Sequence, residues 1–336
     1  MKKWKLGIVS ATGFAKNRHM PSYAKMDNVE MAACCDMNAQ ALEETCDQYG
    51  IPGRYTDLDE MLKDDSLEII SVVVRPQWHI PTARKCVEAG KHVLVEKPLS
   101  EDYREMLEFR DFLSGRDEKV MVSQNYRFQN PALEMKDVID AGELGEPYRL
   151  EVVKYNSSGP TPRDPERYKG LFVNIGVHDV DMIRYLIGRE VEAVWAEPLA
   201  APHTREVTYP FAEIGMFFEG GATASARMDW TTQGLERWTD VRCQGTKAVA
   251  YCDYTVSPDI LVASPEGEKR FHRDEECDDI RKVMNHFIER ISRGEQPDTW
   301  VGDNIKTMEI VLAAYLSCRE KRVVNFPEDR KLLETV

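Results

Sequence analysis

Two patterns of hydrophobic and polar residues divide the chain. Up to about residue 123, short apolar runs alternate with amphipathic stretches, and the runs lie at Leu6–Ser10, Met31–Cys35, Ile69–Val74, 92–95 and 119–123. Strands that are buried on both faces read as continuous apolar runs, and parallel strands need helical connections. The pattern therefore predicts a doubly wound, Rossmann-type parallel sheet in a domain of residues 1–123.

Start and stop signals predict helices between these runs. Residues 13–25 read as the first helix. Asn38 can cap the next helix and Gly50 can end it, because asparagine accepts a hydrogen bond from a free N–H group and glycine adopts the left-handed conformation. Asp57 and Glu60 have the spacing of a capping box at the start of a third helix.

Residues 124–336 follow a different pattern, in which apolar and polar positions alternate. This alternation predicts a large, mainly antiparallel open sheet in an α+β domain. The expected strands lie at 148–156, 191–199, 210–218, 222–230, 240–252 and 259–265, and the expected helices at 131–141, 174–187, 278–293 and 303–318. An open sheet face usually needs a cover, so we expect a homo-oligomer, a dimer or tetramer, formed through this sheet.

Charge and composition narrow the function classes. The formal net charge is -14 and the acidic residues are spread along the chain, which disfavours nucleic-acid binding. The eight cysteines include no C-x-x-C pair and no zinc spacing with histidine, so we expect a reducing compartment and no metal. The longest apolar run is too short to cross a membrane, and the N-terminus continues as strand, turn and helix rather than as a signal peptide. We expect a cytoplasmic protein with no membrane partner.

The turn after the first apolar run is the first place to look for a ligand, because doubly wound sheets bind ligands outside the carboxyl ends of their strands. A dinucleotide-binding turn normally carries small residues at the three fixed positions of G-x-G-x-x-G/A. Here the turn has a single glycine, Gly13, and its other candidate residues are Ser10, Thr12, Phe14 and Ala15. The N–H groups at the helix start do not depend on side chains. We therefore expect this backbone to hold the cofactor phosphates.

Asp36 ends the second apolar run. An acid at this place can accept hydrogen bonds from the adenosine ribose hydroxyls and repel a 2′-phosphate, which favours NAD over NADP. A turn or helix-capping aspartate has the same spacing, and the sequence alone does not decide between the two.

Lys97 follows the fourth buried strand within Glu96-Lys97-Pro98. Pro98 restricts Lys97 to extended conformations, and a lysine in a crevice can hydrogen-bond a substrate hydroxyl and stabilise developing alkoxide charge. An exposed lysine at a strand end is the alternative interpretation, and it is the favoured one for an isolated E-K-P string.

Asn174 and His178 lie one helical turn apart in the expected helix over 174–187, with Asp181 and Tyr185 on the same face. Histidine is the usual general base near neutral pH, so this polar stripe can form the wall of a site. A structural histidine remains the alternative.

Several motifs together resemble one family. They are the first strand, turn and helix, Asp36, "AGKHVLVEKPLS" at 89–100, "NYRF" at 125–128, "GELGEPYRLEV" at 142–152, "NIGVHDVDMIRYLIG" at 174–188 and the tail at 301–324. Because these motifs occur in the order found in that family, the chain is similar to the Gfo/Idh/MocA oxidoreductases, such as glucose–fructose oxidoreductase and inositol dehydrogenase. The resemblance covers nearly the whole chain.

The resemblance implies a nicotinamide cofactor on the first domain and a sugar, inositol or polyol substrate between the domains. It implies that Lys97 lies close to nicotinamide and substrate and that His178 is the catalytic base. Asn174 stands where the family often has aspartate, so it can hydrogen-bond substrate but cannot accept a proton. His19 lies one residue later than the usual histidine of the family, so an inserted residue would place Ala11 and Gly13 at the first two glycine positions.

Further contacts are expected around these residues. The remaining cofactor contacts are expected at Val74, Arg75, Pro76, His79, Glu96 and Asn125, mostly through the backbone, although Arg75 could instead pair with Glu96. The remaining substrate contacts are expected at Tyr126, Arg127, Arg163 and Tyr168, each with a packing or solvated role as the alternative.

Three functions fit the motifs. The first is an NAD-dependent dehydrogenase that transfers a hydride from a carbinol carbon. The second is an NAD-using glycosidase of the same fold, in which the cofactor is retained and no net NADH forms. The third is a dinucleotide-sensing regulator without catalysis, against which the presence of both Lys97 and His178 argues.

Overall fold

The computed structural model describes residues 2–156, 170–199, 211–229, 237–253 and 257–336. The chain forms two compact units. Unit 1 comprises Met1–Asn125 with Asp278–Ile305, and unit 2 comprises Tyr126–Cys277 with Lys306–Val336. The sequence pattern placed all of 278–305 in the second domain, but this segment packs with unit 1. The division of labour between the two domains stays a prediction.

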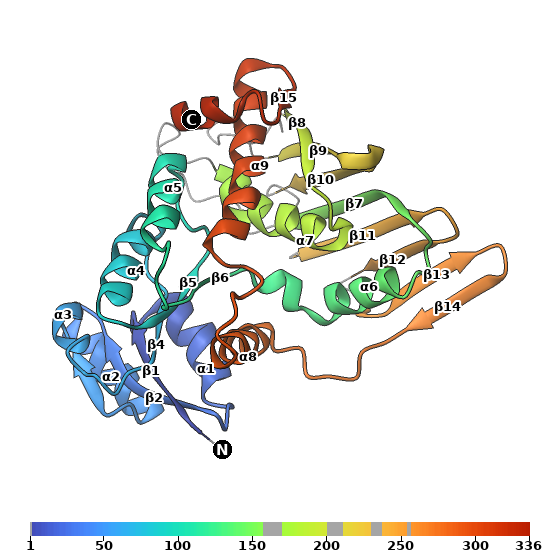
Figure 1. The fold of residues 1–336 in the computed structure, drawn as a ribbon. Coiled ribbons are helices and arrows are strands. Elements are labelled where there is room, and N and C mark those ends of the chain that lie inside the picture. Colours follow the sequence, from blue (N-terminus) through green and yellow to red (C-terminus); the bar gives the residue numbers. More distant parts are fainter. Residues whose placement is uncertain (1, 157–169, 200–210, 230–236, 254–256) are drawn as a thin grey trace. The chain divides into compact units, whose positions relative to one another are not determined.

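Unit 1 is built on a six-stranded parallel sheet with the order β3-β2-β1-β4-β5-β6. Its strands are β1 Trp4–Val9, β2 Val29–Cys35, β3 Gly53–Tyr55, β4 Ile69–Val72, β5 His92–Glu96 and β6 Val120–Ser123. The predicted doubly wound sheet is confirmed. The strand order reverses between β1 and β4, which is the switch point where such sheets bind dinucleotides (Figure 1).

Helices pack against this sheet, and all but the last of them lie between its strands along the chain. They are α1 Met20–Tyr23, α2 Ala39–Tyr49, α3 Leu58–Met61, α4 His79–Glu88, α5 Tyr103–Phe112 and α8 Asp279–Ser292, with a 3-10 turn, η2, at Pro76–Trp78. Asn38 caps α2 by accepting from the N–H of Ala41, and Gly50 ends α2 at φ 65°, as predicted. The expected capping box is wrong in part, because Asp57 accepts from the N–H of Asp59 while Glu60 pairs with Lys63.

The first helix differs from the expected α-helix over 13–25. A π-helix, η1, runs over Ala15–His19 and is followed by the short α1. A π turn holds one more residue than an α turn and is common near functional sites. It can therefore accommodate one inserted residue, which fits the one-residue offset of His19 noted in the sequence.

Unit 2 contains a nine-stranded sheet with the order β14-β13-β12-β11-β7-β10-β9-β8-β15, in which only β7 and β10 pair in parallel. Its strands are β7 Pro147–Asn156, β8 Val191–Leu199, β9 Phe211–Phe218, β10 Thr223–Asp229, β11 Arg237–Gly245, β12 Val249–Asp253, β13 Ile260–Ser264, β14 Gly267–Phe271 and β15 Val324–Asn325. The mainly antiparallel sheet is confirmed, but the segment expected as one strand over 240–252 is a hairpin of β11 and β12.

Among the described residues, the two faces of this sheet differ in burial. The buried side chains of β7 and β10 include Val152 and Met228. Both strands pack against α7 Val177–Ile187, which also packs on α6 Asn130–Asp140 (Figure 1). The alternate positions, including Glu151 and Arg227, are half-buried or exposed. Two further helices of the chain are α9 Val301–Glu320 and the closing 3-10 helix η6 Arg330–Thr335.

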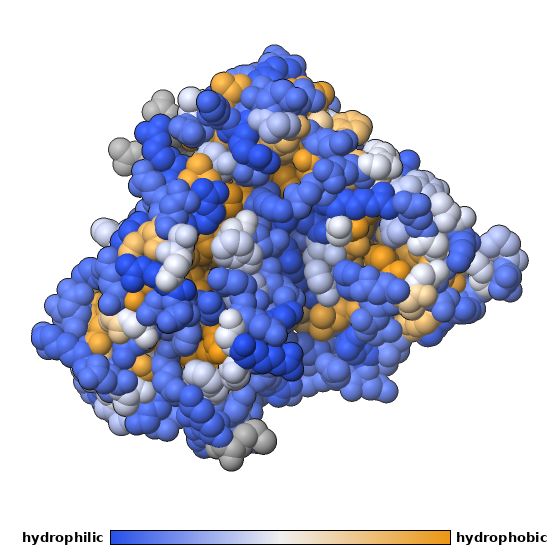
Figure 2. All heavy atoms as spheres, viewed as in Figure 1, coloured by the Kyte–Doolittle hydropathy of each residue, from blue (hydrophilic) through white to orange (hydrophobic). Residues whose placement is uncertain are grey.

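Hydrophilic residues cover most of the visible face of the chain, and apolar residues show only in small areas (Figure 2). Among the residues that the structure describes, no helix is long and apolar enough to cross a membrane.

Candidate active site

The turn after β1 has the backbone conformation of a glycine-rich turn although it has one glycine. Ser10 has φ 110° and Gly13 has φ 51°. The N–H of Ser10 donates to the carbonyl of Cys35 at 2.9 Å, and the Ser10 hydroxyl accepts from the N–H of Thr12 at 3.3 Å. Positive φ is strained for a residue with a Cβ atom. Ser10 thus takes the conformational place of a fingerprint glycine, while Thr12, Gly13 and Phe14 remain exposed and Ala15 is buried.

Asp36 fixes this turn against β2. One carboxylate oxygen accepts from the N–H of Ala11 at 2.8 Å, and the other accepts from the N–H of Asn38 at 2.9 Å. The turn-forming interpretation of Asp36 is therefore correct at least in part. Each carboxylate oxygen can accept a second hydrogen bond, so a ribose contact is compatible with this arrangement.

Three large apolar side chains are exposed in the segments that follow the carboxyl ends of strands in this sheet. Phe14 follows β1, Met37 follows β2 and Trp78 follows β4, and they are 47%, 92% and 58% exposed. Exposed apolar side chains beside a predicted cofactor site are candidates for contact with an aromatic base of the cofactor. Met37 and Trp78 were not predicted from the sequence; their position just after apolar strands was the available signal.

The loop after β4 is held by His79. Its ring is buried, with Nδ1 2.6 Å from the carbonyl oxygen of Pro98 and Nε2 3.0 Å from that of Val74. Burial lowers the pKa of His79, although the two carbonyls oppose this effect. His79 thus joins the loops after β4 and β5, and this favours a supporting role rather than contact of its ring with the cofactor. Val74 and Pro76 are half-buried and Arg75 is exposed.

Glu96 and Lys97 lie at the carboxyl end of β5. The Glu96 carboxylate is buried, accepts from the backbone N–H of Lys97 at 3.1 Å, and lies 2.9 Å from Nε2 of His19. Glu96 therefore pairs with His19 rather than with Arg75. The Lys97 side chain is half-buried, and the Lys97–Pro98 peptide bond is cis. His19 was not among the predicted site residues.

Asn125 has a contact that favours a structural role. Its side-chain amide donates to the carboxylate of Asp279 at 2.6 Å, and the same carboxylate pairs with Arg18 at 2.9 Å. Asn125 therefore fixes the first turn of α8. Its predicted contact with the cofactor would have to be made by another atom of the residue.

The second group of predicted residues lies in unit 2. A π-helix, η4 Phe172–Gly176, carries Asn174 and runs directly into α7, which carries His178. The imidazole of His178 is 8% exposed and stacks on Tyr126, with ring centroids 4.0 Å apart and planes at 13°. The ammonium group of Lys154 lies 4.5 Å from the Tyr126 ring centroid and forms a buried ion pair with Asp179.

The side chain of Arg127 forms an ion pair within unit 2. Its guanidinium makes two hydrogen bonds to the Asp181 carboxylate, at 2.6 and 2.8 Å, and Thr307 donates to the same carboxylate at 3.0 Å. Both charged side chains are buried. This arrangement favours a structural role for Arg127 over the predicted contact with substrate. Arg163 and Tyr168, the other two predicted substrate residues, lie outside the described residues.

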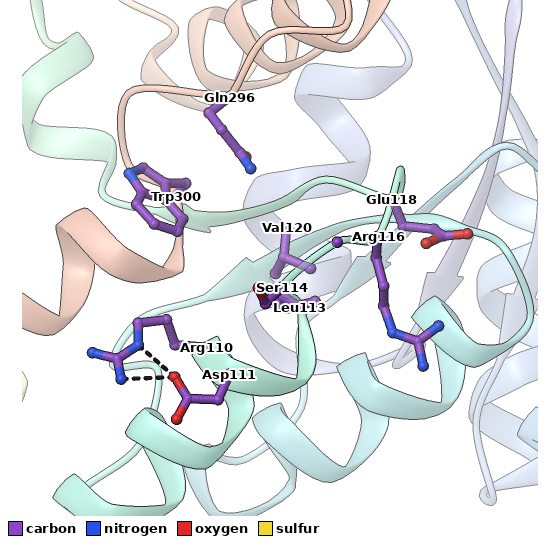
Figure 3. A pocket seen from close by; sticks show the side chains of 10 residues that line it. Arg110, Asp111, Leu113, Ser114, Arg116, Glu118, Val120, Gln296 and Trp300 are labelled. Carbon is purple, nitrogen blue, oxygen red and sulfur yellow. Dashed lines mark hydrogen bonds and ion pairs between the residues drawn. The ribbon is translucent and has the colours of Figure 1, made fainter.

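A separate pocket of about 310 Å³ lies at the other end of the unit 1 strands, beside Val120, the first residue of β6 (Figure 3). Arg110 and Trp300 line it, and Arg110 is paired with Asp111. It contains none of the predicted site residues. Within the described parts of the chain, no three histidine, cysteine or acidic residues are arranged to hold a metal ion.

The chain was compared with known proteins. The family model of oxidoreductases with an NAD-binding Rossmann fold matches residues 4–124, and the model of the GFO/IDH/MocA C-terminal domain matches residues 132–251. A myo-inositol 2-dehydrogenase of Thermotoga maritima is 23% identical over 320 residues, which cover 92% of this chain and 95% of that protein.

Solved structures share the fold over nearly the full length. A levoglucosan dehydrogenase in complex with NADH and L-sorbose superposes with a TM-score of 0.87 at 20% identity, over 97% of this chain and all of that one. An oxidoreductase of Agrobacterium radiobacter in complex with NAD+, L-tartaric acid and magnesium gives 0.85 at 21% identity, over 96% and 98%. With both family models matched in chain order, the protein belongs to the Gfo/Idh/MocA family of oxidoreductases with an NAD-binding Rossmann fold.

Proposed function

We propose that this protein is an NAD-dependent dehydrogenase that oxidises a carbinol carbon of a sugar, inositol or related polyol, or reduces the corresponding carbonyl. The observation that carries the proposal is that several predicted site residues of unit 1 lie at the carboxyl ends of the strands of one sheet. The Ser10–Ala15 turn, Asp36 and Lys97 all follow strand ends of this sheet, around the switch point. Its relatives include proteins named as myo-inositol 2-dehydrogenase and D-apiose dehydrogenase, which supports the substrate class.

NAD fits the residues at these strand ends. The N–H groups of Ala11 and Thr12 donate to Asp36 and to the Ser10 hydroxyl, so a pyrophosphate would be held mainly by the exposed Gly13 and Phe14 backbone at the start of the helix. Asp36 places a negative charge at the end of β2, where the 2′-phosphate of NADP would be repelled. NAD supplies the hydride acceptor at nicotinamide C4. The preference for NAD over NADP is part of the proposal.

Lys97 and His178 divide the remaining chemistry. His178 takes the proton of the substrate hydroxyl, and the Lys97 ammonium group donates a hydrogen bond to the same oxygen and stabilises its developing negative charge. Tyr126 holds the imidazole of His178 in one orientation by stacking on it. Asn174 is half-buried one turn earlier and binds substrate through its amide without accepting a proton.

The test begins with cofactor binding, measured by NADH fluorescence titration, and continues with a screen of polyols and keto-sugars followed by NADH absorbance. H178A should lower turnover roughly 10²- to 10⁴-fold while NADH binding is retained. H286A, which alters a histidine on α8, serves as the matched control. Unchanged turnover in H178A would eliminate His178 as the base.

The other two functions give different results in the same assays. Cleavage of a glycoside with retained cofactor and no net NADH would indicate the glycosidase. Tight NADH binding without turnover on any substrate of the screen would indicate the sensor.

A second copy of the chain is proposed to cover the outer face of the unit 2 sheet. Stacked Tyr155 and Trp238 lie on this face, beside the ion pair of Arg227 and Glu213. A dimer or tetramer by light scattering supports this assembly, and a monomer at micromolar concentration contradicts it. The cytoplasmic location stays a prediction from the sequence.

A further inference from the structure

Four buried polar side chains form a continuous hydrogen-bonded chain that ends beside Lys97. The hydroxyl oxygens of Ser71 on β4 and Tyr23 on α1 are 3.0 Å apart, and Tyr23 lies 2.8 Å from Nδ1 of His19 on η1. Nε2 of His19 lies 2.9 Å from the Glu96 carboxylate on β5. All four belong to unit 1, and each is at most 8% exposed.

The direction of the hydrogen bond between His19 and Glu96 is fixed by chemistry. An ionised carboxylate only accepts, so Nε2 of His19 carries the proton that faces Glu96 whether the imidazole is neutral or charged. Burial raises the pKa of Tyr23, although Ser71 opposes this effect, so the phenol keeps its proton and can turn to donate or to accept at Nδ1. The four side chains can therefore keep their hydrogen bonds to one another whether the imidazole of His19 is neutral or charged.

Glu96 is kept ionised despite its burial. Burial by itself raises the pKa of this carboxyl group, but the hydrogen bond from His19 and the electrostatic attraction of His19 and Lys97 outweigh it, and the pKa lies below its ordinary value. A buried carboxylate is seldom a gain in stability over a well-packed apolar residue. Its position next to Lys97 gives it a use in the reaction.

The network fixes a charge rather than conducting protons. Its far end, Ser71, is fully buried in the central strand β4. At its near end, the Glu96 carboxylate accepts from the backbone N–H of Lys97, so it also fixes the peptide from which the lysine side chain starts. His79 on α4 is a further titratable group that interacts electrostatically with Glu96 and Lys97.

We propose that His19 and Tyr23 are positioning residues that hold Glu96 as a carboxylate beside Lys97, and that this carboxylate keeps Lys97 in the ammonium form that hydrogen-bonds the substrate oxygen. The inference rests on the proposed role of Lys97 in the dehydrogenase reaction. It assigns to the π turn η1 the task of bringing His19 to Glu96.

The test uses near-isosteric variants of the full chain. E96Q removes the charge but keeps the shape. H19L removes the donor to Glu96, whereas H19Q keeps an amide N–H near the place of Nε2. Y23F removes only the hydroxyl, and Y49F is its control, because the Tyr49 hydroxyl of the same unit donates to the backbone carbonyl of Lys16 at 2.9 Å.

The first readout needs no substrate. Competitive labelling of lysines with acetic anhydride, followed by mass spectrometry across a pH series, reports the protonation of Lys97. Loss of a neighbouring negative charge makes an ammonium group easier to deprotonate, so E96Q and H19L should move the labelling midpoint of Lys97 to lower pH by about one pH unit. H19Q and Y49F should stay near the wild type, and Y23F should lie between.

The second readout is kinetic. With the best substrate of the screen, E96Q and H19L should lower kcat roughly 10- to 100-fold with NADH affinity within about threefold, because a misplaced or neutral lysine affects mainly the chemical step. H19Q should recover most of this loss. Should H19L not fold, E96Q, H19Q and Y23F still decide the matter.

The two readouts separate two possible failures. An unchanged labelling midpoint in both E96Q and Y23F overturns the inference, whatever the turnover. Unchanged turnover in K97A overturns the proposed role of Lys97, while the labelling result still reports whether the network controls its charge.

Discussion

Ser10→Gly is expected to stabilise the protein, although it removes a side chain with a hydrogen bond. Ser10 has φ 110°, a conformation that costs a residue with a Cβ atom about 1–2 kcal/mol and costs glycine almost nothing. Against this gain, glycine makes the unfolded chain more disordered, which costs about 0.4–1 kcal/mol. The lost bond from the N–H of Thr12 is 3.3 Å long and exposed, so water replaces it at little cost. The net expectation is a gain of about 0.5–1 kcal/mol.

Ser66→Gly is the matched control. Ser66 is exposed in the same unit and lies outside the positive-φ positions of the backbone; its hydroxyl accepts a 3.4 Å contact from Lys5 and hydrogen-bonds the Asp64 carboxylate at the exposed surface. This substitution adds the unfolded-state cost without releasing strain, so it should destabilise by about 0.4–1 kcal/mol. The difference between the two variants, about 1–2 kcal/mol, measures the strain at Ser10.

Equilibrium unfolding in urea at 25 °C gives both free energies. The NADH dissociation constant of S10G should stay within about threefold of the wild type, since the N–H groups of the turn are unchanged. A Ser10→Gly variant that is destabilised as much as Ser66→Gly would show that Ser10 holds its conformation without strain.

Three further outcomes are expected. Asp36→Ser should narrow the preference for NADH over NADPH by roughly 10-fold in fluorescence titrations, because the charge that repels a 2′-phosphate is lost; an unchanged ratio would mean that the aspartate only shapes the turn. Arg127→Met should lower the free energy of unfolding by about 3–5 kcal/mol, since it leaves the buried Asp181 carboxylate without its main partner, and the double variant with Asp181→Leu should recover part of that loss. Glu96 has a lowered pKa in the folded state, so it contributes stability above its ordinary pKa that is lost as the pH falls through the folded value. Urea midpoints between pH 3 and 7 should therefore depend less on pH in E96Q than in the wild type, and parallel pH curves would contradict this.

The apolar runs predicted the central strands of unit 1, because strands buried on both faces leave an unmistakable pattern. The strands that were missed carry too little of it: β3 has three residues, β15 has two, and every residue of β14 is exposed except Phe271, which is half-buried. The turn within 240–252 was missed because the alternation of apolar residues continues through it. Neither π-helix has a period that distinguishes it from an α-helix in the sequence.

The candidate site was predictable where position along a strand decides it. Asp36 and Lys97 lie at strand ends, as the pattern required. The pairs that hold the surrounding side chains in place were not predictable, because they join residues far apart in the chain. His19 and Glu96 are separated by 77 positions, and Arg127 and Asp181 by 54. Spacing and residue type carry no signal for such pairs.

Lys97 and His178 are proposed to act on the same substrate oxygen. A double-mutant cycle with K97M, H178N and the double variant tests this proposal most directly, with kcat/KM on the best polyol as the measured quantity. Two groups that stabilise one transition state are not additive, so the double variant should be about as slow as the slower single variant. A loss equal to the product of the two single losses would contradict the account.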